Sequence, residues 1–348
     1  MLLFLLCVWP PPNKNNVLKV DNPFRVPTFN TSIIIKHVEI IIVNDGSTDN
    51  TGVIADEYRR RYPGIIRVVH KDNGGHGSGI NVGLQVASGL YYKVVDSDDW
   101  LDSKNLLKFI TDMKERLASN SLQDLYITNF IYDHAADNQN HVSEYTKKIP
   151  VGKICGWNEV KSLHFSHMLL MHSLFYRRKI LLQSGVVLPE HTFYVDNIFA
   201  YKPLPFVKTL CYLDLDLYHY FIGRADQSVN INNFVGRYEQ QISVMNIMLT
   251  AYRLEEIKRL PKGLSRYMWH SLQAIMMITI FFTSADYSPA RKKHLKKLWD
   301  DLKKQDRALY RRMKYWSYST FVNFLPWRLR GFVLKKGYFI LCKKIKFG

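Results

Sequence analysis

Residues 38–49 read Val-Glu-Ile-Ile-Ile-Val-Asn-Asp-Gly-Ser-Thr-Asp, and residues 91–99 read Tyr-Tyr-Lys-Val-Val-Asp-Ser-Asp-Asp. In each stretch, a run of mostly β-branched or aromatic residues stops at an acidic turn. This pattern is typical of a buried parallel strand followed by a tight connection. Both stretches are therefore expected to be strands of one sheet, with their acidic residues at its edge.

Helical and strand patterns alternate around these two stretches. Helices are expected at residues 48–61, 80–87 and 105–117, and a further strand at 65–69. Such alternation predicts an α/β fold, a Rossmann-like and mostly parallel sheet flanked by helices. Beyond about residue 233 the pattern becomes helical and basic. We therefore expect an unassigned segment at 1–21, an α/β domain at 22–233 and a helical region at 234–348.

The composition suits a folded protein with an anionic partner. The chain has 348 residues, 47% of them hydrophobic, and a formal net charge of +18. Basic pairs recur from Arg291 onward, and aromatic residues such as Trp316 and Phe321 lie between them. This region is either a solvated basic helix face or a contact with an anionic membrane surface. Nucleic acid is not expected, because no known nucleic-acid-binding motif is present.

No segment of the sequence is expected to span a membrane. The apolar run from Met1 to Trp9 is too short, and it lacks the charged start of a signal peptide. The uncharged stretch from Tyr267 to Ser284 is interrupted by His270 and Gln273, so we expect a buried helix there. The four cysteines form no Cys-x-x-Cys pair, and neither a zinc site nor a disulfide framework is indicated.

The acidic cluster Asp96-Ser97-Asp98 follows its strand directly. Ligands of such sheets bind beyond the carboxyl ends of the strands. Carboxylates gathered at that edge repel phosphates unless a cation lies between them, and Mg²⁺ or Mn²⁺ prefers such oxygen ligands. The motif is short, however, and Asp is also common at turns and helix N-caps.

Two further motifs lie near the same edge. Asp45 ends its strand and is placed to accept a hydrogen bond from a nucleotide base. The segment from Asn73 to Gly79 is rich in glycine and is able to bring backbone N–H groups to a phosphate. Glycine-rich loops are often plain turns, so this motif alone indicates little.

Together these motifs resemble family-2 glycosyltransferases of the bacterial type, which have the GT-A fold. The resemblance rests on the order and spacing of four segments and covers roughly residues 25–230. The segments are Ile40 to Asp49, Asn73-Gly74-Gly75, Asn81-Val82-Gly83 and Val94 to Asp99. It implies transfer of a sugar from a nucleotide-diphosphate donor, usually with inversion and with Mg²⁺ or Mn²⁺.

The resemblance also implies roles for individual residues. Asp98 would bind the metal together with Asp96, and Asp196 in Phe193 to Phe199 would be the catalytic base. One carboxylate suffices for inversion, because it takes the acceptor proton as the hydroxyl attacks. Without the resemblance, a helix N-cap would be the better interpretation of Asp196. The residues expected to bind the donor are Thr28, Phe29, Asp45, Asn73, Asp96, Arg224 and Gln227.

The chain departs from the family near its N-terminus. Val26 to Asn30 matches the motif that ends the first strand of the family, but only Thr31 to His37 precede the next strand. The first βα unit is therefore expected to be abbreviated. This leaves two alternatives to an active transferase: a catalytically impaired binding protein of the same fold, and another nucleotide-using enzyme such as a nucleotidyltransferase.

The expected partners follow from the resemblance and the charge. They are a UDP-sugar or related donor, a glycan or lipid-linked acceptor of cell-surface polysaccharide synthesis, and an anionic membrane surface. We expect a cytoplasmic protein, either free or peripheral at the inner face of the cell membrane.

Overall fold

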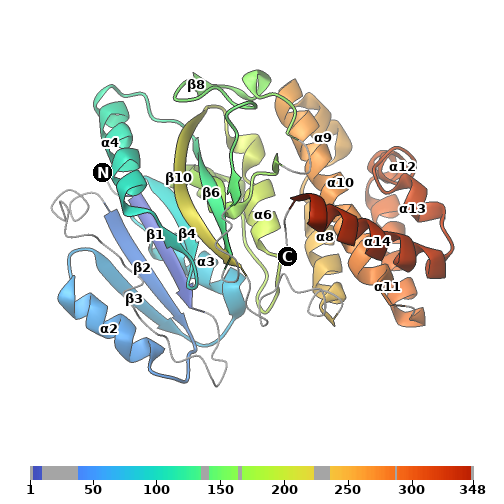
Figure 1. Cartoon of the computed structure of the whole chain (residues 1–348), viewed down its shortest axis with the longest axis horizontal. Coiled ribbons are helices and arrows are strands. Elements are labelled where there is room, and N and C mark those ends of the chain that lie inside the picture. Colours follow the sequence, from blue (N-terminus) through green and yellow to red (C-terminus); the bar gives the residue numbers. More distant parts are fainter. Residues whose placement is uncertain are drawn as a thin grey trace. The chain divides into compact units, whose positions relative to one another are not determined.

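The computed structural model describes residues 3–9, 38–134, 141–163, 167–222, 236–286 and 288–345. The chain divides into two compact units (Figure 1). Unit 1 consists of Met1–Gly156 and Leu169–Ile222, and unit 2 of Trp157–Met168 and Gly223–Gly348. The sequence analysis did not anticipate that a short segment near residue 160 belongs with the C-terminal helices.

Unit 1 is built on one mixed sheet. Among the described residues its strand order is β3-β2-β1-β4-β9-β6-β10-β5, with β7 beside β6 and β8 beside β10. The pairs β2–β3, β1–β2, β1–β4 and β6–β10 are parallel, and β9 runs antiparallel to β4 and β6. The strands are β1 Leu3–Trp9, β2 Val38–Asp45, β3 Ile66–Lys71, β4 Tyr91–Asp96, β5 Trp100–Leu101, β6 Leu125–His134, β7 His141–Ser143, β8 Ile154–Cys155, β9 Leu174–Arg177 and β10 Leu210–Ile222. The α/β fold with a sheet flanked by helices is confirmed, but the sheet is mixed rather than mostly parallel, because the short strands β5, β7, β8 and β9 pair antiparallel with the longer ones.

The strand β1 comes from the segment that the sequence left unassigned. It lies between β2 and β4, and its Leu5 is level with Ile40 on one side and Lys93 on the other. The sequence analysis expected the first strand to end near Val26 to Asn30. Those residues lie outside the described part of the chain, so the structure adds a strand at 3–9 without describing the motif.

The helices of unit 1 pack on the sheet through apolar faces. They are α2 Thr51–Arg61, α3 Gly75–Val86, α4 Ser103–Ala118, α5 Arg178–Ser184 and α6 Asp196–Tyr201, with short 3-10 turns η3 Met171–Ser173 and η4 Leu204–Phe206. In α4, Leu106, Phe109, Ile110 and Met113 are buried at helical spacing. The Asp102 side chain caps this helix by accepting a hydrogen bond from the Asn105 N–H at 2.8 Å.

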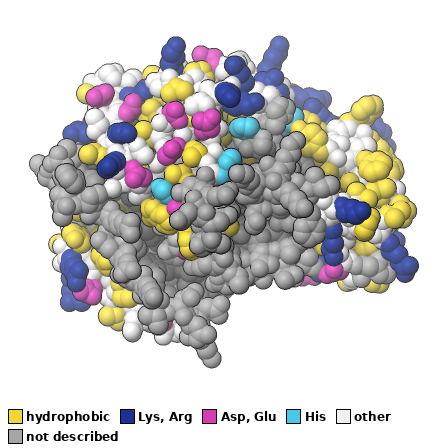
Figure 2. Space-filling model, viewed as in Figure 1, with side chains coloured by type: hydrophobic (Ala, Val, Ile, Leu, Met, Phe, Trp, Pro, Cys, Tyr) yellow, Lys and Arg dark blue, Asp and Glu magenta, His cyan; other side chains and the backbone are white. Residues whose placement is uncertain are grey.

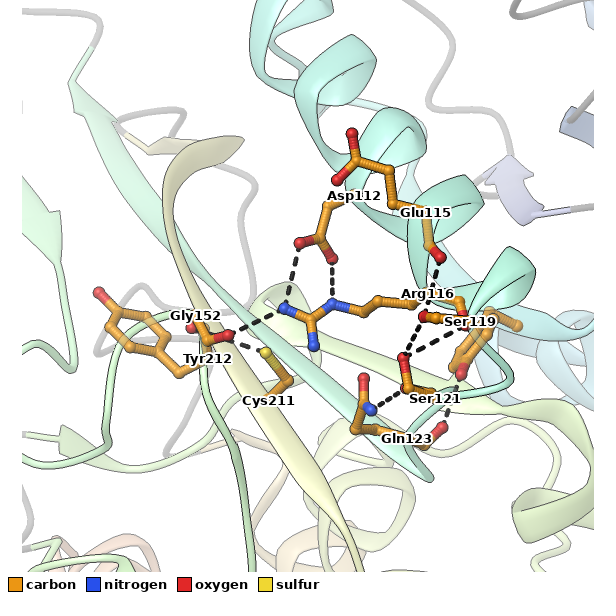
Figure 3. Close-up of polar contacts among 10 residues, drawn as sticks. Asp112, Glu115, Arg116, Ser119, Ser121, Gln123, Gly152, Cys211 and Tyr212 are labelled. Atoms are coloured by element: carbon orange, nitrogen blue, oxygen red, sulfur yellow. Dashed lines mark hydrogen bonds and ion pairs between the residues drawn. The ribbon is translucent and has the colours of Figure 1, made fainter.

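The C-terminal end of α4 is held by one arginine. Arg116 donates to both carboxylate oxygens of Asp112, at 2.6 and 3.1 Å, and to the carbonyl oxygen of Gly152 at 2.9 Å (Figure 3). Because Gly152 N–H in turn donates to the Tyr212 carbonyl, this contact joins α4 to the connection beside β10. A planar guanidinium suits such a two-oxygen contact.

Unit 2 is helical. It contains η1 Trp157–Glu159, α8 Tyr238–Ala251, α9 Leu254–Arg259, α10 Lys262–Ser284, α11 Pro289–Gln305, α12 Arg307–Tyr315, α13 Thr320–Phe324 and α14 Trp327–Ile345. The long helix α10 contacts η1, α8, α9, α11 and α14 (Figure 1). Most of its side chains are buried, which confirms the buried helix expected near Tyr267 to Ser284. None of the helices described is both long and apolar enough to cross a membrane.

Candidate active site

The site lies where the parallel strands of unit 1 end. The central strand β1 brings β2 and β4 into register, so that Val8 is level with both Val43 and Asp96. Asp45 and Asp96 are the last residues of their strands and therefore project at the same edge of the sheet. This is the convergence that the sequence predicted.

The Asp45 carboxylate is already well supplied with donors. It is 1% exposed, and it accepts hydrogen bonds from Lys71 Nζ at 2.6 Å, from Gly74 N–H at 2.9 Å and from Gly75 N–H at 2.7 Å. The sequence suggested that N–H groups of this glycine-rich loop bind phosphate. For Gly74 and Gly75 that expectation is wrong, because both point at Asp45. Contact of Asp45 with a donor base remains a prediction.

Asn73 links the two loops at this edge. Its side-chain Nδ2 donates to the Asp45 carbonyl oxygen at 3.0 Å, while the residue itself is exposed. Gly46 has a φ of +71°, and a Cβ there would lie 2.6 Å from the Asn73 backbone nitrogen. Only glycine fits this close crossing of the two loops.

Asp96 lies between two histidines. His76 Nε2 is 2.8 Å from Asp96 Oδ1, and His172 Nε2 is 3.8 Å from Asp96 Oδ2. Burial opposes ionisation of Asp96, but the two histidines outweigh it and hold the pKa of this carboxyl well below its usual range. Burial likewise opposes charge on His76, and Asp96, followed by Asp196 and Asp98, raises the pKa of its imidazole.

Asp99 is a second buried carboxylate beside Asp96, and the sequence analysis assigned it no role. Its Oδ2 accepts a hydrogen bond from Tyr218 Oη at 2.5 Å, and its Oδ1 accepts one from Phe221 N–H at 2.9 Å. Burial raises its pKa well above the ordinary value, and the charges of Asp96 and Asp98 add to this effect. Asp99 is thus held by β10, which lies far from it in the sequence.

Asp96, Asp99 and His172 form a group that is able to hold a metal ion. One ligand atom of each lies within 4.8 Å of the others. Two carboxylate oxygens and one imidazole nitrogen are a suitable set of ligands for Mn²⁺, and the two oxygens also suit Mg²⁺. A cation there would also offset two buried carboxylates of like charge. Asp98, which the sequence named as the ligand beside Asp96, is outside this group, and its role remains a prediction.

Asp196 lies close to the same histidines. It is the first residue of α6, and the charges of His172 and His76 act on its carboxyl. Burial is the largest influence and raises the pKa of Asp196, while the two histidines draw it down. Two residues earlier, Tyr194 has a φ of 65°, a left-handed conformation that is uncommon outside glycine and often occurs at functional sites.

Comparison with known proteins agrees with this geometry. Residues 30–177 match the family model described as Glycosyl transferase family 2. The part of the chain from residue 30 to residue 177 is therefore a family-2 glycosyltransferase domain.

Several bacterial proteins are similar to this chain. EpsH of Bacillus subtilis (strain 168), provisionally named a glycosyltransferase, is 28% identical over 214 residues, which is 59% of this chain and 56% of EpsH. The minor teichoic acid biosynthesis protein GgaB of the same organism is 35% identical over 91 residues, 25% of this chain and 10% of GgaB. The chain thus spans about half the length of EpsH and much less of GgaB.

Solved structures share the fold. Residues 1–349 of Staphylococcus aureus TarS superpose with a TM-score of 0.63 at 16% identity, covering 96% of this chain and 92% of that one. The same TarS fragment has also been solved with UDP-GlcNAc. The GT-A fold inferred from the sequence is confirmed by this similarity.

The glycosyltransferase domain contains a buried lysine that the sequence analysis did not single out. Lys93 on β4 is 0% exposed, and its Nζ donates to the carbonyl oxygens of Met171 (3.0 Å) and His172. Burial lowers its pKa well below the ordinary value. By holding the backbone at residues 171–172, Lys93 positions His172 beside Asp96. The sequence offered one signal for this residue, which is that a charged side chain stands within an otherwise apolar strand.

The glycine-rich loop of the glycosyltransferase domain is joined to the segment that leads to Asp196. His191 N–H donates to the Gly74 carbonyl at 2.7 Å, and Ser78 Oγ donates to Glu190 at 2.8 Å. A Cβ on Gly77 would lie 2.6 Å from the Pro189 carbonyl oxygen. The glycines therefore allow close backbone packing between the two parts of the site.

The structure gathers only some of the predicted residues. Asp45, Asn73, Asp96, Asp98 and Asp196 all lie in unit 1, and the charges of Asp96, Asp98 and Asp196 act together on His76. The other predicted donor-binding residues lie outside the described residues; they are Thr28, Phe29, Arg224 and Gln227. The structure also adds His172, to which the sequence analysis gave no role, as a member of the group that is able to hold a metal ion.

Proposed function

We propose that this protein transfers a sugar from a nucleotide-diphosphate donor to an acceptor hydroxyl, with inversion at the anomeric carbon. One observation carries the proposal: the same two histidines, His76 and His172, act on Asp196 and on Asp96 of the group that is able to hold a metal ion. A group that suits a divalent cation and a carboxylate suited to proton transfer therefore lie at the same edge of the sheet. Together with a family-2 glycosyltransferase domain, this arrangement favours transfer over mere binding.

Asp96, Asp99 and His172 would hold Mg²⁺ or Mn²⁺, which when bound offsets the charge of a leaving diphosphate. Asp98 is proposed as a further ligand. Asp196 would accept the proton of the acceptor hydroxyl as that oxygen attacks the anomeric carbon. Its raised pKa makes it a stronger base than an ordinary carboxylate, which suits this role. No second nucleophile is needed for a single displacement.

A UDP-sugar is the proposed donor. Support comes from the fold similarity to TarS, which has been solved with UDP-GlcNAc, and from Asp45 at the strand end. Asp45 and Asn73, together with Thr28, Phe29, Arg224 and Gln227, are proposed to line the donor site. The name of GgaB, a minor teichoic acid biosynthesis protein, supports a cell-surface polysaccharide as the acceptor. A lipid-linked glycan as the acceptor and a place at the cytoplasmic side of the membrane are proposed with it.

A screen of common nucleotide sugars tests the proposal. The purified protein is incubated with each donor and Mn²⁺, and the released products are identified. A transferase slowly hydrolyses its own donor and releases a nucleoside diphosphate. A parallel assay with nucleoside triphosphates and sugar phosphates tests the alternative, because a nucleotidyltransferase would release pyrophosphate from the triphosphate. If no donor is turned over and none binds, the chain is not an active transferase.

Metal dependence is tested with the donor found in that screen. Removal of divalent ions with EDTA should abolish release of the diphosphate, and Mn²⁺ or Mg²⁺ should restore it. Asp99→Asn and Asp98→Asn, compared side by side, show which carboxylate binds the metal with Asp96. Full activity in EDTA would rule out the metal-binding role of this group.

A further inference from the structure

The exposed hydrophobic side chains of this protein are concentrated in one part of unit 2. Of the seventeen large hydrophobic residues exposed in the described part of the chain, eight fall between Tyr315 and Val333. The most exposed are Trp316 at 80%, Phe321 at 69%, Phe324 at 63% and Phe332 at 57%. We call these four residues the aromatic surface. Single exposed hydrophobic residues are ordinary, but such a concentration of aromatic rings indicates an interaction site.

The aromatic surface is not explained by packing within unit 2. The same short segment has other residues for that purpose: Met313 and Val322 are buried, and Gly331 is buried where a Cβ would lie 2.5 Å from the Ser284 carbonyl oxygen. The helices α12 to α14 therefore bury one set of residues and leave the aromatic rings in water. Figure 2 shows hydrophobic side chains beside Lys and Arg where these helices lie.

The segment of sequence that carries the aromatic surface has charge of a single sign, and an acidic residue that contacts it, Asp286 at 3.9 Å from Lys335, comes from outside the segment. From Arg307 to Gly348 the sequence contains eleven Lys and Arg residues and no Asp or Glu. Arg311, Arg328, Lys335 and Lys336 are exposed. Lys336 Nζ lies 4.7 Å from the centre of the Phe332 ring, so cation and aromatic ring share the same patch. A partner for this region must accept both aromatic rings and positive charge.

We infer that the aromatic surface and its basic neighbours bind the surface of an anionic lipid bilayer. Aromatic rings sit well at the boundary of headgroups and acyl chains, and Lys and Arg are attracted to anionic lipid headgroups. No described helix is able to span a bilayer, so α12 to α14 would lie on its surface. A soluble polyanion would use the basic residues but leave the aromatic rings in water. The inference is independent of sugar transfer, because lipid binding requires neither donor nor metal.

Vesicle sedimentation tests the inference. The full-length protein is mixed with vesicles of phosphatidylcholine alone or with one third phosphatidylglycerol. We expect binding to the anionic vesicles, at least tenfold weaker binding to the neutral ones, and progressive loss of binding as NaCl is raised. Equal binding to both compositions, or binding to neither, would overturn the inference.

Two double variants separate the contributions of the rings and the charges. Trp316→Ser with Phe321→Ser, and Lys335→Gln with Lys336→Gln, should each weaken binding about tenfold or more. The matched controls lie in and beside α2: Val53→Ser with Tyr62→Ser, and Arg60→Gln with Arg61→Gln, all at exposed positions. The controls should bind like the wild type. Helical circular dichroism shows whether each variant is folded.

The fluorescence of Trp316 gives a readout that does not depend on the double variants. Anionic vesicles should shift the emission to shorter wavelength as the indole leaves water, and Trp316→Phe should remove that shift. A shift that persists in Trp316→Phe would contradict the inference. So would a dimer in solution that Phe321→Ser abolishes, because the aromatic surface would then be an interface between two copies.

Discussion

At the residue scale, the site depends on one carboxylate, Asp96, between two imidazoles. His76 is 2.8 Å from one oxygen of Asp96, and His172 is 3.8 Å from the other. Each imidazole comes from a different part of the chain, the glycine-rich loop or the turn before β9. The histidines keep Asp96 ionised despite its burial, as a ligand of a divalent cation must be.

Asp196→Asn separates an active transferase from a binding protein of the same fold. The substitution removes the proton acceptor but keeps the size of the side chain. We expect turnover to fall 10²- to 10⁴-fold, the usual contribution of a general base, while affinity for the donor changes little. Steady-state kinetics and titration calorimetry measure these two quantities. Unchanged turnover would show that another group takes the proton.

The same residue predicts the pH dependence of the wild type. A base acts only when deprotonated, so turnover should fall as pH drops through the pKa of Asp196. Because burial raises that pKa, the fall should begin at higher pH than for an ordinary carboxyl near 3.8. The pH profile of kcat, measured at saturating donor, gives this pKa. The fall at low pH should be absent from the residual activity of Asp196→Asn.

His76→Gln tests the histidine beside Asp96. The variant keeps a polar side chain but loses the imidazole, and a hydrogen bond to a charged group contributes about 1.5–3 kcal/mol. We expect roughly tenfold weaker binding of UDP in the presence of Mn²⁺. The control is His70→Gln, since His70 contacts Asn44 and Asp56 away from the metal-binding group. Equal affinities of the two variants would show that His76 has no part in binding.

At the element scale, close backbone approach joins segments that are distant in the sequence. In unit 1 the glycine-rich loop packs on residues 188–191 just before α6, so the loop and the proposed base are joined through backbone contacts. In unit 2 the start of α10 packs on η1 in the same way. A Cβ on Gly263 would lie 1.7 Å from the Trp157 carbonyl oxygen. Both contacts require glycine because any side chain would displace a main chain.

Gly263→Ala tests the contact between α10 and η1. Overpacking typically costs about 1–3 kcal/mol, and we expect at least that loss in the free energy of unfolding, because a carbonyl group of the main chain must move. Urea unfolding followed by circular dichroism measures it. The control is Gly337→Ala in α14, where a Cβ meets no atom within 4 Å. That change should be neutral or slightly stabilising. Equal stability of both variants would contradict the close approach.

At the scale of the whole molecule, the positive charge is unevenly distributed. The net charge is +18, yet the proposed active site in unit 1 gathers four acidic residues whose charges act on one another or on the same histidine, Asp96, Asp98, Asp99 and Asp196. The longest stretch of sequence with basic but no acidic residues, from residue 307 to residue 348, lies at the C-terminal end of unit 2. The overall charge therefore says more about the proposed membrane contact than about the site of sugar transfer.

Ligand binding should be visible in the thermal stability of the full-length protein. UDP with Mn²⁺ at 100 times the dissociation constant stabilises the folded state by about 2.7 kcal/mol. We expect a rise of a few degrees in the melting temperature. The rise should shrink without Mn²⁺ and disappear in Asp96→Asn. The same rise with and without metal would argue against a metal-bridged diphosphate.

The sequence by itself determined the architecture of the sheet edge. Runs such as Ile40 to Val43 and Tyr91 to Val95 are local signals, since β-branched and aromatic residues favour buried strands wherever they occur. The acidic residues after each run therefore marked the site before any contact was known. The family resemblance added Asp196, which no local pattern distinguishes from a helix N-cap.

Only the tertiary structure decided which residues meet at that edge. Asp99 is joined to Tyr218, His172 to Asp96, and Lys93 to the carbonyl group of His172, across separations of 76 to 119 residues. The central strand at 3–9 was also invisible to local patterns, because a short apolar run becomes a strand only when neighbours pair with it. The physical reason is the same in each case: strand pairing and burial create these contacts, and neither is encoded within a single segment.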